Sequence, residues 1–231
     1  MLKGFSLNRI NAIRKTESIW LLVVGFLLLS GCLETKDRPA VADVNDLSNF
    51  SNFENSLFPL NVGNEWVYNY NSERTLAYVE KTEMVDNLQT FVVVRKYREE
   101  QMRTWYFENE SGIFSVKSKN RFSKEHHNPH LPIILKSKLE KGNSWNYVAG
   151  SEQFDTAYQI ESLGKRRVGT AAGEFNAYGF KIKAVSKDKT LEFTSWYAPG
   201  VGFVKQTESP DEKGVEITVF DLSSHELKKK Q

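Results

Sequence analysis

Three of the four histidines of this chain gather in one short segment. His126, His127 and His130 follow Glu125 closely. Imidazole nitrogens suit zinc, copper or nickel, and short histidine-rich tracts bind such ions. Pro129 prevents a regular helix here, so the histidines cannot be assumed to share one face. The segment is a candidate metal site, and the alternative interpretation is a solvated connector, because a metal site also needs fixed partners around its ligands.

No other pattern in the chain predicts catalysis. Carboxylates are plentiful, but their spacing singles out no acid–base pair; the clearest are Glu108, Glu110, Asp155 and Glu161. The sequence has no GxSxG elbow, no phosphate-binding glycine loop and no CxxC pair. We therefore predict that the protein is not an enzyme, and we predict no cofactor.

The N-terminal segment predicts export. A basic start precedes an apolar run from Ile19 to Leu29. The run is shorter than the ~20 residues that a membrane-spanning helix needs, but it has the length of a signal-peptide core. It ends in Leu29-Ser30-Gly31-Cys32, which resembles the lipobox of bacterial lipoproteins. The resemblance implies a signal peptide over residues 1–31 and acylation of Cys32, which would anchor the chain to a lipid bilayer.

The anchor implied by this resemblance is a strong one. Each buried CH₂ group of an acyl chain adds about 0.8 kcal/mol, so two or three chains hold a protein permanently. Leu33 follows the cysteine where Asp would retain enterobacterial lipoproteins at the inner membrane. By resemblance to that sorting rule, we expect the outer membrane, with the folded part facing the periplasm. Cys32 is also the only cysteine, so the folded part has no disulfide and depends on its core.

The charge of the mature part argues against nucleic acid as a partner. The whole chain has 31 Lys and Arg and 29 Asp and Glu, and 27 and 28 of these follow residue 31. A protein that binds nucleic acid normally needs a basic surface. Residues 32–56 are rich in Asp, Asn, Ser and Glu and predict a flexible tether.

A repeated motif predicts the organisation of the folded part. LNVGNEWVY at residues 60–68 returns as LEKGNSWNY at 139–147. The Gly-Asn pair is typical of a tight turn into a strand. A second match between the halves is the Trp-Tyr pair, which occurs at residues 105–106 and again at 196–197. We predict one β domain over 57–231, built from two related halves at about 58–120 and 137–222.

Strand patterns fill both halves. Residues 74–85 and 89–100 bracket Asp86-Asn87 and predict a hairpin, and a second hairpin follows around residues 109–112. Trp66 and Trp105 of the first half are 39 residues apart, whereas Trp145 and Trp196 of the second half are 51 residues apart. The second half is therefore longer by about 12 residues. We expect the extra length at 165–176 as a loop or additional hairpin. The predicted fold is all-β and mainly antiparallel, as a strongly curved sheet or incomplete barrel.

The motifs FPLxVGNxWxY, VGTxAGEFxAYxFKI and WYAPGVGFVK resemble those of the TapB-like proteins, uncharacterised bacterial secreted and lipid-anchored β proteins. The resemblance covers roughly residues 58–207. It implies a curved antiparallel sheet similar to that of the lipoprotein carriers of the Lol system. It implies no catalytic residue, and a fold alone does not define a function.

Two non-catalytic roles are consistent with these observations. The first is a structural or interaction module that docks an envelope protein through a sheet edge or surface patch. The second is a carrier of a hydrophobic ligand in an aromatic-lined concavity. The candidate lining residues are Trp66, Tyr68, Trp105, Trp145, Tyr147 and Trp196. Aromatic residues at alternate positions also fill cores, so the two roles differ in whether these rings leave a space between them.

Overall fold

The computed structural model describes residues 56–120, 125–128, 131–136, 139–151, 154–187, 189–208 and 216–228. Every regular element in these ranges is a β-strand. Accordingly, no helix in the described part of the chain is long and apolar enough to cross a membrane. The signal segment, Cys32 and the predicted tether up to residue 55 lie outside the described residues.

Thirteen strands form one antiparallel sheet. The first half contributes β1 (Glu65–Tyr70), β2 (Glu73–Val85), β3 (Leu88–Tyr97), β4 (Glu100–Asn109) and β5 (Gly112–Asn120). Two short strands follow, β6 (His126–His127) and β7 (Ile133–Lys136). The second half contributes β8 (Ser144–Ser151), β9 (Phe154–Thr170), β10 (Gly173–Ser186), β11 (Lys189–Ala198), β12 (Gly202–Glu208) and β13 (Ile217–Glu226).

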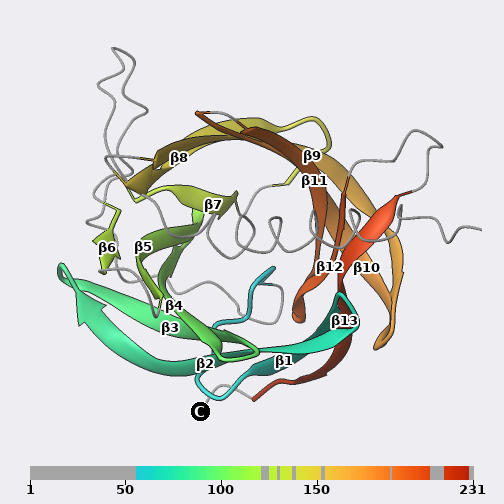
Figure 1. Cartoon of the computed structure of the whole chain (residues 1–231), viewed down its shortest axis with the longest axis horizontal. Helices are drawn as coiled ribbons and strands as arrows, with labels where there is room; N and C mark the ends of the chain where they lie inside the picture. Colours follow the sequence, from blue (N-terminus) through green and yellow to red (C-terminus); the bar gives the residue numbers. More distant parts are fainter. Residues whose placement is uncertain are drawn as a thin grey trace, which may run out of the picture.

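The sheet curls into a nearly closed ring (Figure 1). Its strand order is β6-β5-β4-β3-β2-β1-β13-β12-β11-β10-β9-β8, and β7 also pairs with β5. Each half is a meander, and the two halves join where β1 pairs with β13. No strand pairing joins β8 to β5, β6 or β7 within the described residues, so the ring has one unsealed seam. The predicted all-β curved sheet or incomplete barrel is confirmed.

The hairpin predicted around Asp86-Asn87 is confirmed. It joins β2 to β3, and both turn residues have positive φ, 49° and 64°. Asn and Asp tolerate this conformation better than other non-glycine residues. The long hairpin that this turn closes follows the curvature of the ring (Figure 1).

The two copies of the repeated motif form the same turn. Gly63 and Gly142 have φ of 85° and 88°, a region that favours glycine. Their N–H groups donate to the carbonyls of Val79 at 2.9 Å and Ser162 at 2.8 Å. The asparagine after each glycine accepts the return bond from the same residue, at 2.9 and 2.8 Å. Each motif therefore locks the start of the first strand of its half to the strand that follows it.

The main hydrophobic core involves strands from both halves. Its fully buried members include Trp66, Val93, Phe180, Val204 and Leu222. The segment before β1 also enters the ring, where Phe58 and Leu60 are buried in the same core (Figure 1). The start of the predicted β domain is thus packed inside the ring before its first strand begins.

The extra residues at 165–176 lengthen β9 and β10 into one long hairpin, with its turn at residues 171–172. The tip of this hairpin reaches β13, where the Ala172 N–H donates to the Leu222 carbonyl at 2.8 Å. The Ala171 N–H donates to Asp221 Oδ2 at 2.9 Å. The added length therefore connects the β9–β10 hairpin to β13, which is not paired with either strand in the sheet.

Candidate functional site

The structure brings most of the predicted aromatic residues together. Trp66, Tyr68, Trp145 and Trp196 are buried members of the main core, and Tyr147 packs against it. Trp105 is buried in a second, smaller cluster with Val92, Phe107 and Val116. Five of the six candidates therefore share one core, and Trp105 does not.

The rings in the main core are covered by other side chains. Phe58 stacks on Trp66 with centroids 5.8 Å apart, and Trp145 meets Phe180 edge-on at 5.9 Å. Both tryptophans also satisfy their indole N–H groups. Trp66 Nε1 donates to the Val201 carbonyl at 2.6 Å, and Trp145 Nε1 donates to the Ile133 carbonyl at 3.1 Å. These rings contribute packing and hydrogen bonding to the core.

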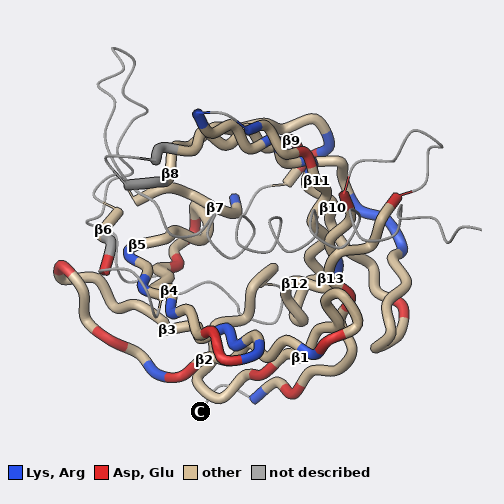
Figure 2. The backbone as a smooth tube through the Cα atoms, viewed as in Figure 1, with Lys and Arg blue, Asp and Glu red and all other residues tan. Residues whose placement is uncertain are grey.

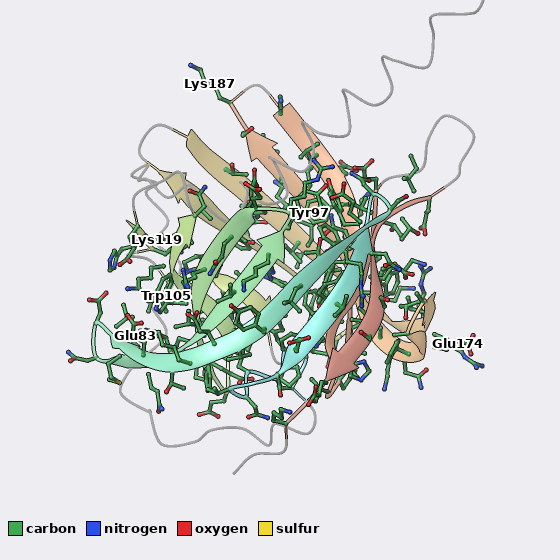
Figure 3. The ribbon with its side chains drawn as sticks, turned by 60° about the horizontal axis from the view of Figure 1, so that its bottom comes forward. Glu83, Tyr97, Trp105, Lys119, Glu174 and Lys187 are labelled. Atoms are coloured by element: carbon green, nitrogen blue, oxygen red, sulfur yellow. The ribbon has the colours of Figure 1, made fainter. Side chains whose placement is uncertain are left out.

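Trp105 belongs to a charged cluster beside β2 and β5. Lys117 Nζ lies 4.3 Å from the Trp105 ring centroid and is paired with Glu125 at 2.9 Å and Glu83 at 3.5 Å. Figure 3 shows Trp105 and Glu83 on the same part of the wall. The hydrogen bond from Lys117 is the largest cause of the lowered pKa of Glu125. The Lys117 ammonium, which is nearly buried, is thus balanced by carboxylates.

The histidine segment forms the short strand β6, with His126 and His127 paired to Ser118 and Lys117. His127 is exposed, with Nε2 3.3 Å from Glu125 Oε1 and Nδ1 3.7 Å from Asp86 Oδ2. His130 lies outside the described residues. Among the residues whose side chains are described, no group of three or more His, Cys, Asp or Glu side chains is arranged to hold a metal ion. The metal site at His126, His127 and His130 stays a prediction.

Charged residues are mixed around the ring. Lys and Arg positions are interspersed with Asp and Glu positions around the described part of the ring (Figure 2). This distribution agrees with the near-neutral mature part, and the described residues show no long basic stripe that could follow a phosphate backbone.

One charged residue on the inner face was missed by the sequence analysis. Arg95 lies on β3 between Val93 and Tyr97 at alternate positions, and both of these residues belong to the main core. Alternate residues of a strand point to the same face. The period-2 pattern of Phe91, Val93 and Arg95 could have indicated this position, because an arginine here continues an apolar face.

Three tyrosines in or beside the main core are neutral at physiological pH. Burial is the largest cause of the raised pKa of Tyr68 and Tyr147, and it raises the pKa of Tyr197 to about 12. Tyr147 and Tyr197 nevertheless keep part of their surface accessible. These side chains lie deep in the fold but are still reached by water.

The seam has one long free edge. β8 has a single hydrogen-bonded neighbour, β9, among the described strands. Across the seam, the Trp145 bond to the Ile133 carbonyl on β7 is a side-chain contact rather than a strand ladder. Lys136 of β7 also lies over the Trp145 ring, at 5.6 Å from its centroid. Val148 on β8 is exposed at this edge.

Comparison with known proteins gives little that could assign a role. No family model and no curated protein matches the sequence. Two solved structures are similar in fold. A candidate lipoprotein from Parabacteroides distasonis ATCC 8503 shares 15% identity with a TM-score of 0.41, over 74% of this chain and 99% of that one. A candidate exported protein with a YmcC-like fold from Bacteroides fragilis NCTC 9343 shares 12% identity with a TM-score of 0.42, over 75% of this chain and 100% of that one.

Those descriptions apply to the two proteins themselves. At these TM-scores the similarity assigns this chain neither a family nor a role. The resemblance to TapB-like and Lol-carrier proteins stays a prediction.

Proposed function

We propose that this chain is a lipid-anchored protein of the bacterial envelope with a non-catalytic docking role. The lipobox-like LSGC sequence at residues 29–32 supports the anchor. Its predicted place is the outer membrane, with the ring facing the periplasm. Substituting Cys32→Ser should abolish incorporation of labelled palmitate and release the protein from the membrane fraction. Retention of label in that variant would contradict acylation at Cys32.

The free edge of β8 is the observation that supports docking. A strand with unpaired N–H and C=O groups can add a strand from another chain, and natural proteins usually protect such edges. On β8, the edge is long and carries the exposed Val148. The partner we propose is an envelope protein that offers an extended segment to this edge.

Site-specific crosslinking in cells tests this docking. A photoreactive residue at Val148 should give one discrete product, and mass spectrometry should map it to an extended segment of a single envelope protein. The matched control is Ile217, which is 48% exposed against 53% for Val148 but lies on β13, in the middle of the strand order and away from the seam. No product at position 148, or the same product at both positions, would contradict docking at the seam.

The alternative role predicted from the sequence is a carrier of a hydrophobic ligand. It requires space beside the six candidate aromatics. Trp66 and Trp145 have their rings against neighbouring core side chains, and Trp105 lies in the smaller cluster. Ligand binding at these six positions stays a prediction, and a different part of the inner face offers better binding chemistry.

A further inference from the structure

Arg95 lies on the inner face of the ring, and the residues paired with it on the two adjacent strands carry no charge. It pairs with Ala77 on β2 and Met102 on β4. Residues paired across antiparallel strands share a face, and Ala77 is a fully buried member of the main core. Arg95 itself is only partly buried. Its guanidinium therefore lies on the core side of the wall, where water still has access to it.

Unsatisfied hydroxyl groups lie on the same face. Thr104 and Ser118 pair with each other one rung from Met102, and each is only 1% exposed. Thr75 pairs with Tyr97, one rung from Arg95 on the other side. The side-chain oxygens of all three residues have no hydrogen-bond partner. The inner face around Arg95 is therefore partly polar, although the apolar core adjoins it.

The tyrosines near Arg95 supply dipoles but no opposite charge. Burial acts to lower the pKa of Arg95, but its tyrosine neighbours outweigh burial, and the pKa is raised. These neighbours are Tyr106, which takes part in a side-chain hydrogen bond with Arg95, Tyr68 on β1 and Tyr197 on β11. The guanidinium is a permanent cation, and burial raises the pKa of Tyr68 and Tyr197, so these two phenols are neutral near pH 7.

No carboxylate among the described residues lies within ion-pair distance of Arg95. Two other arginines of the same wall are paired, since Arg103 meets Glu80 at 3.0 Å and Arg98 meets Glu73 at 2.5 Å. Leaving a charge unpaired in a protein interior is costly, and such charges normally have partners. Arg95 forms no ion pair within the described part of the chain, and unlike the exposed Arg74 it lies on the inner face.

We propose that the inner face around Arg95 is a binding site for an anionic group, a carboxylate or phosphate, at the head of an amphiphilic molecule. A guanidinium binds such groups through two parallel hydrogen bonds. The Tyr106 hydroxyl, which is hydrogen-bonded to Arg95, helps to hold the guanidinium in place. Phe203 and Tyr197, whose ring centroids are 5.4 Å apart and which both keep part of their surface accessible, provide an apolar surface for the rest of the molecule.

This site is separate from docking at β8, and either can fail without the other. The same head-group chemistry could also come from a small free anion. Decanoate, decanol and inorganic phosphate distinguish these sources, because decanol keeps the apolar chain without charge and phosphate keeps the charge without the chain.

The test is isothermal titration calorimetry of these three probes with the chain from residue 33 onward. Every described strand and core residue lies after residue 55, so this chain keeps the whole folded unit. Decanoate should bind the wild-type chain at least about tenfold more tightly than the Arg95→Gln variant, because a charge-assisted bidentate contact is lost. Lys96→Gln is the matched control, since Lys96 is the exposed neighbour on the opposite face. It should bind decanoate as the wild type does.

The remaining arms identify the ligand class. Decanol should bind wild type and Arg95→Gln equally. Phosphate binding that depends on Arg95, without decanoate binding, would support the anion site and assign it to a small free anion. Absence of binding for both anions, or equal decanoate binding by wild type and Arg95→Gln, would overturn the proposal. If Arg95→Gln fails to fold, Arg95→Lys takes its place and should show weaker but measurable binding, and unchanged affinity in that variant would also overturn the proposal.

Discussion

Gly179 lies directly beneath the ring of Trp196, and this contact makes the long hairpin sensitive to a single methyl group. The two residues pair across β10 and β11. A Cβ atom at position 179 would come within 2.4, 2.6 and 2.9 Å of three atoms of the Trp196 ring. Trp196 is almost fully buried, and the Arg166 guanidinium lies 3.9 Å from its ring centroid on the exposed side. The ring therefore has little freedom to move away.

We expect Gly179→Ala to lower the free energy of unfolding by about 1–3 kcal/mol, the usual cost of overpacking a core. Gly169→Ala is the matched control on the neighbouring strand, because a Cβ there meets nothing within 4 Å. This control should be neutral or slightly stabilising, since alanine reduces the freedom of the unfolded chain. Urea unfolding of both variants measures the difference. At this size each kcal/mol corresponds to a shift of about 2–4 °C in Tm.

A double-mutant cycle with Trp196→Phe checks the cause. The three close atoms belong to the six-membered part of the indole, and a phenylalanine ring can settle further from the backbone. Gly179→Ala should then cost at least about 1 kcal/mol less in the Trp196→Phe background than in the wild type. Equal stability of Gly179→Ala and Gly169→Ala, or an unchanged cost in the cycle, would refute the steric argument.

Two pH-dependent predictions follow from the charged and phenolic groups. Burial raises the pKa of Tyr197 to about 12. Its neutral phenol should therefore contribute stability that is present below the unfolded pKa of about 10 and is lost as pH rises toward 12. Absorbance at 295 nm should show ionisation coinciding with unfolding, and Tyr197→Phe should move that unfolding to higher pH. The hydrogen bond from Arg103 is the largest cause of the lowered pKa of Glu80, so this pair should contribute stability above the unfolded pKa of about 4.3 and lose it as pH falls. Because both groups are partly exposed, Glu80→Gln should cost under about 1 kcal/mol at pH 7 and less at pH 3, and an equal cost at both values would argue against the ion pair.

Much of the fold could be predicted from local sequence signals. The residue types at the Asp86-Asn87 turn and at the two Gly-Asn turns indicate a backbone with positive φ, because few other residues adopt positive φ easily. The strands β6 and β7 could not be predicted, since two and four residues next to prolines are too short to show a period. The position of the seam depends on these short strands, so it could not be predicted from the sequence either.

The candidate site was less predictable for a physical reason. Trp105 and Tyr106 are adjacent, so alternation places them on opposite faces, and a bulge between them also shifts the register. The sequence does not indicate which of the two faces the core. Arg95 interacts with Tyr197, which is far away in the chain and comes from the other half. Such a contact exists only once the sheet has closed into a ring.

The junction of β1 and β13 also determines how the ring is presented to its surroundings. Both ends of the folded part meet there, since the Lys228 N–H donates to Asn64 Oδ1 at 2.7 Å and Asn61 Nδ2 donates to the Lys228 carbonyl at 3.3 Å. This junction lies at the middle of the strand order, and the seam lies at its two ends. In a ring, these positions are on opposite walls. The wall that holds both ends of the described β domain and the wall that holds the seam therefore face away from each other.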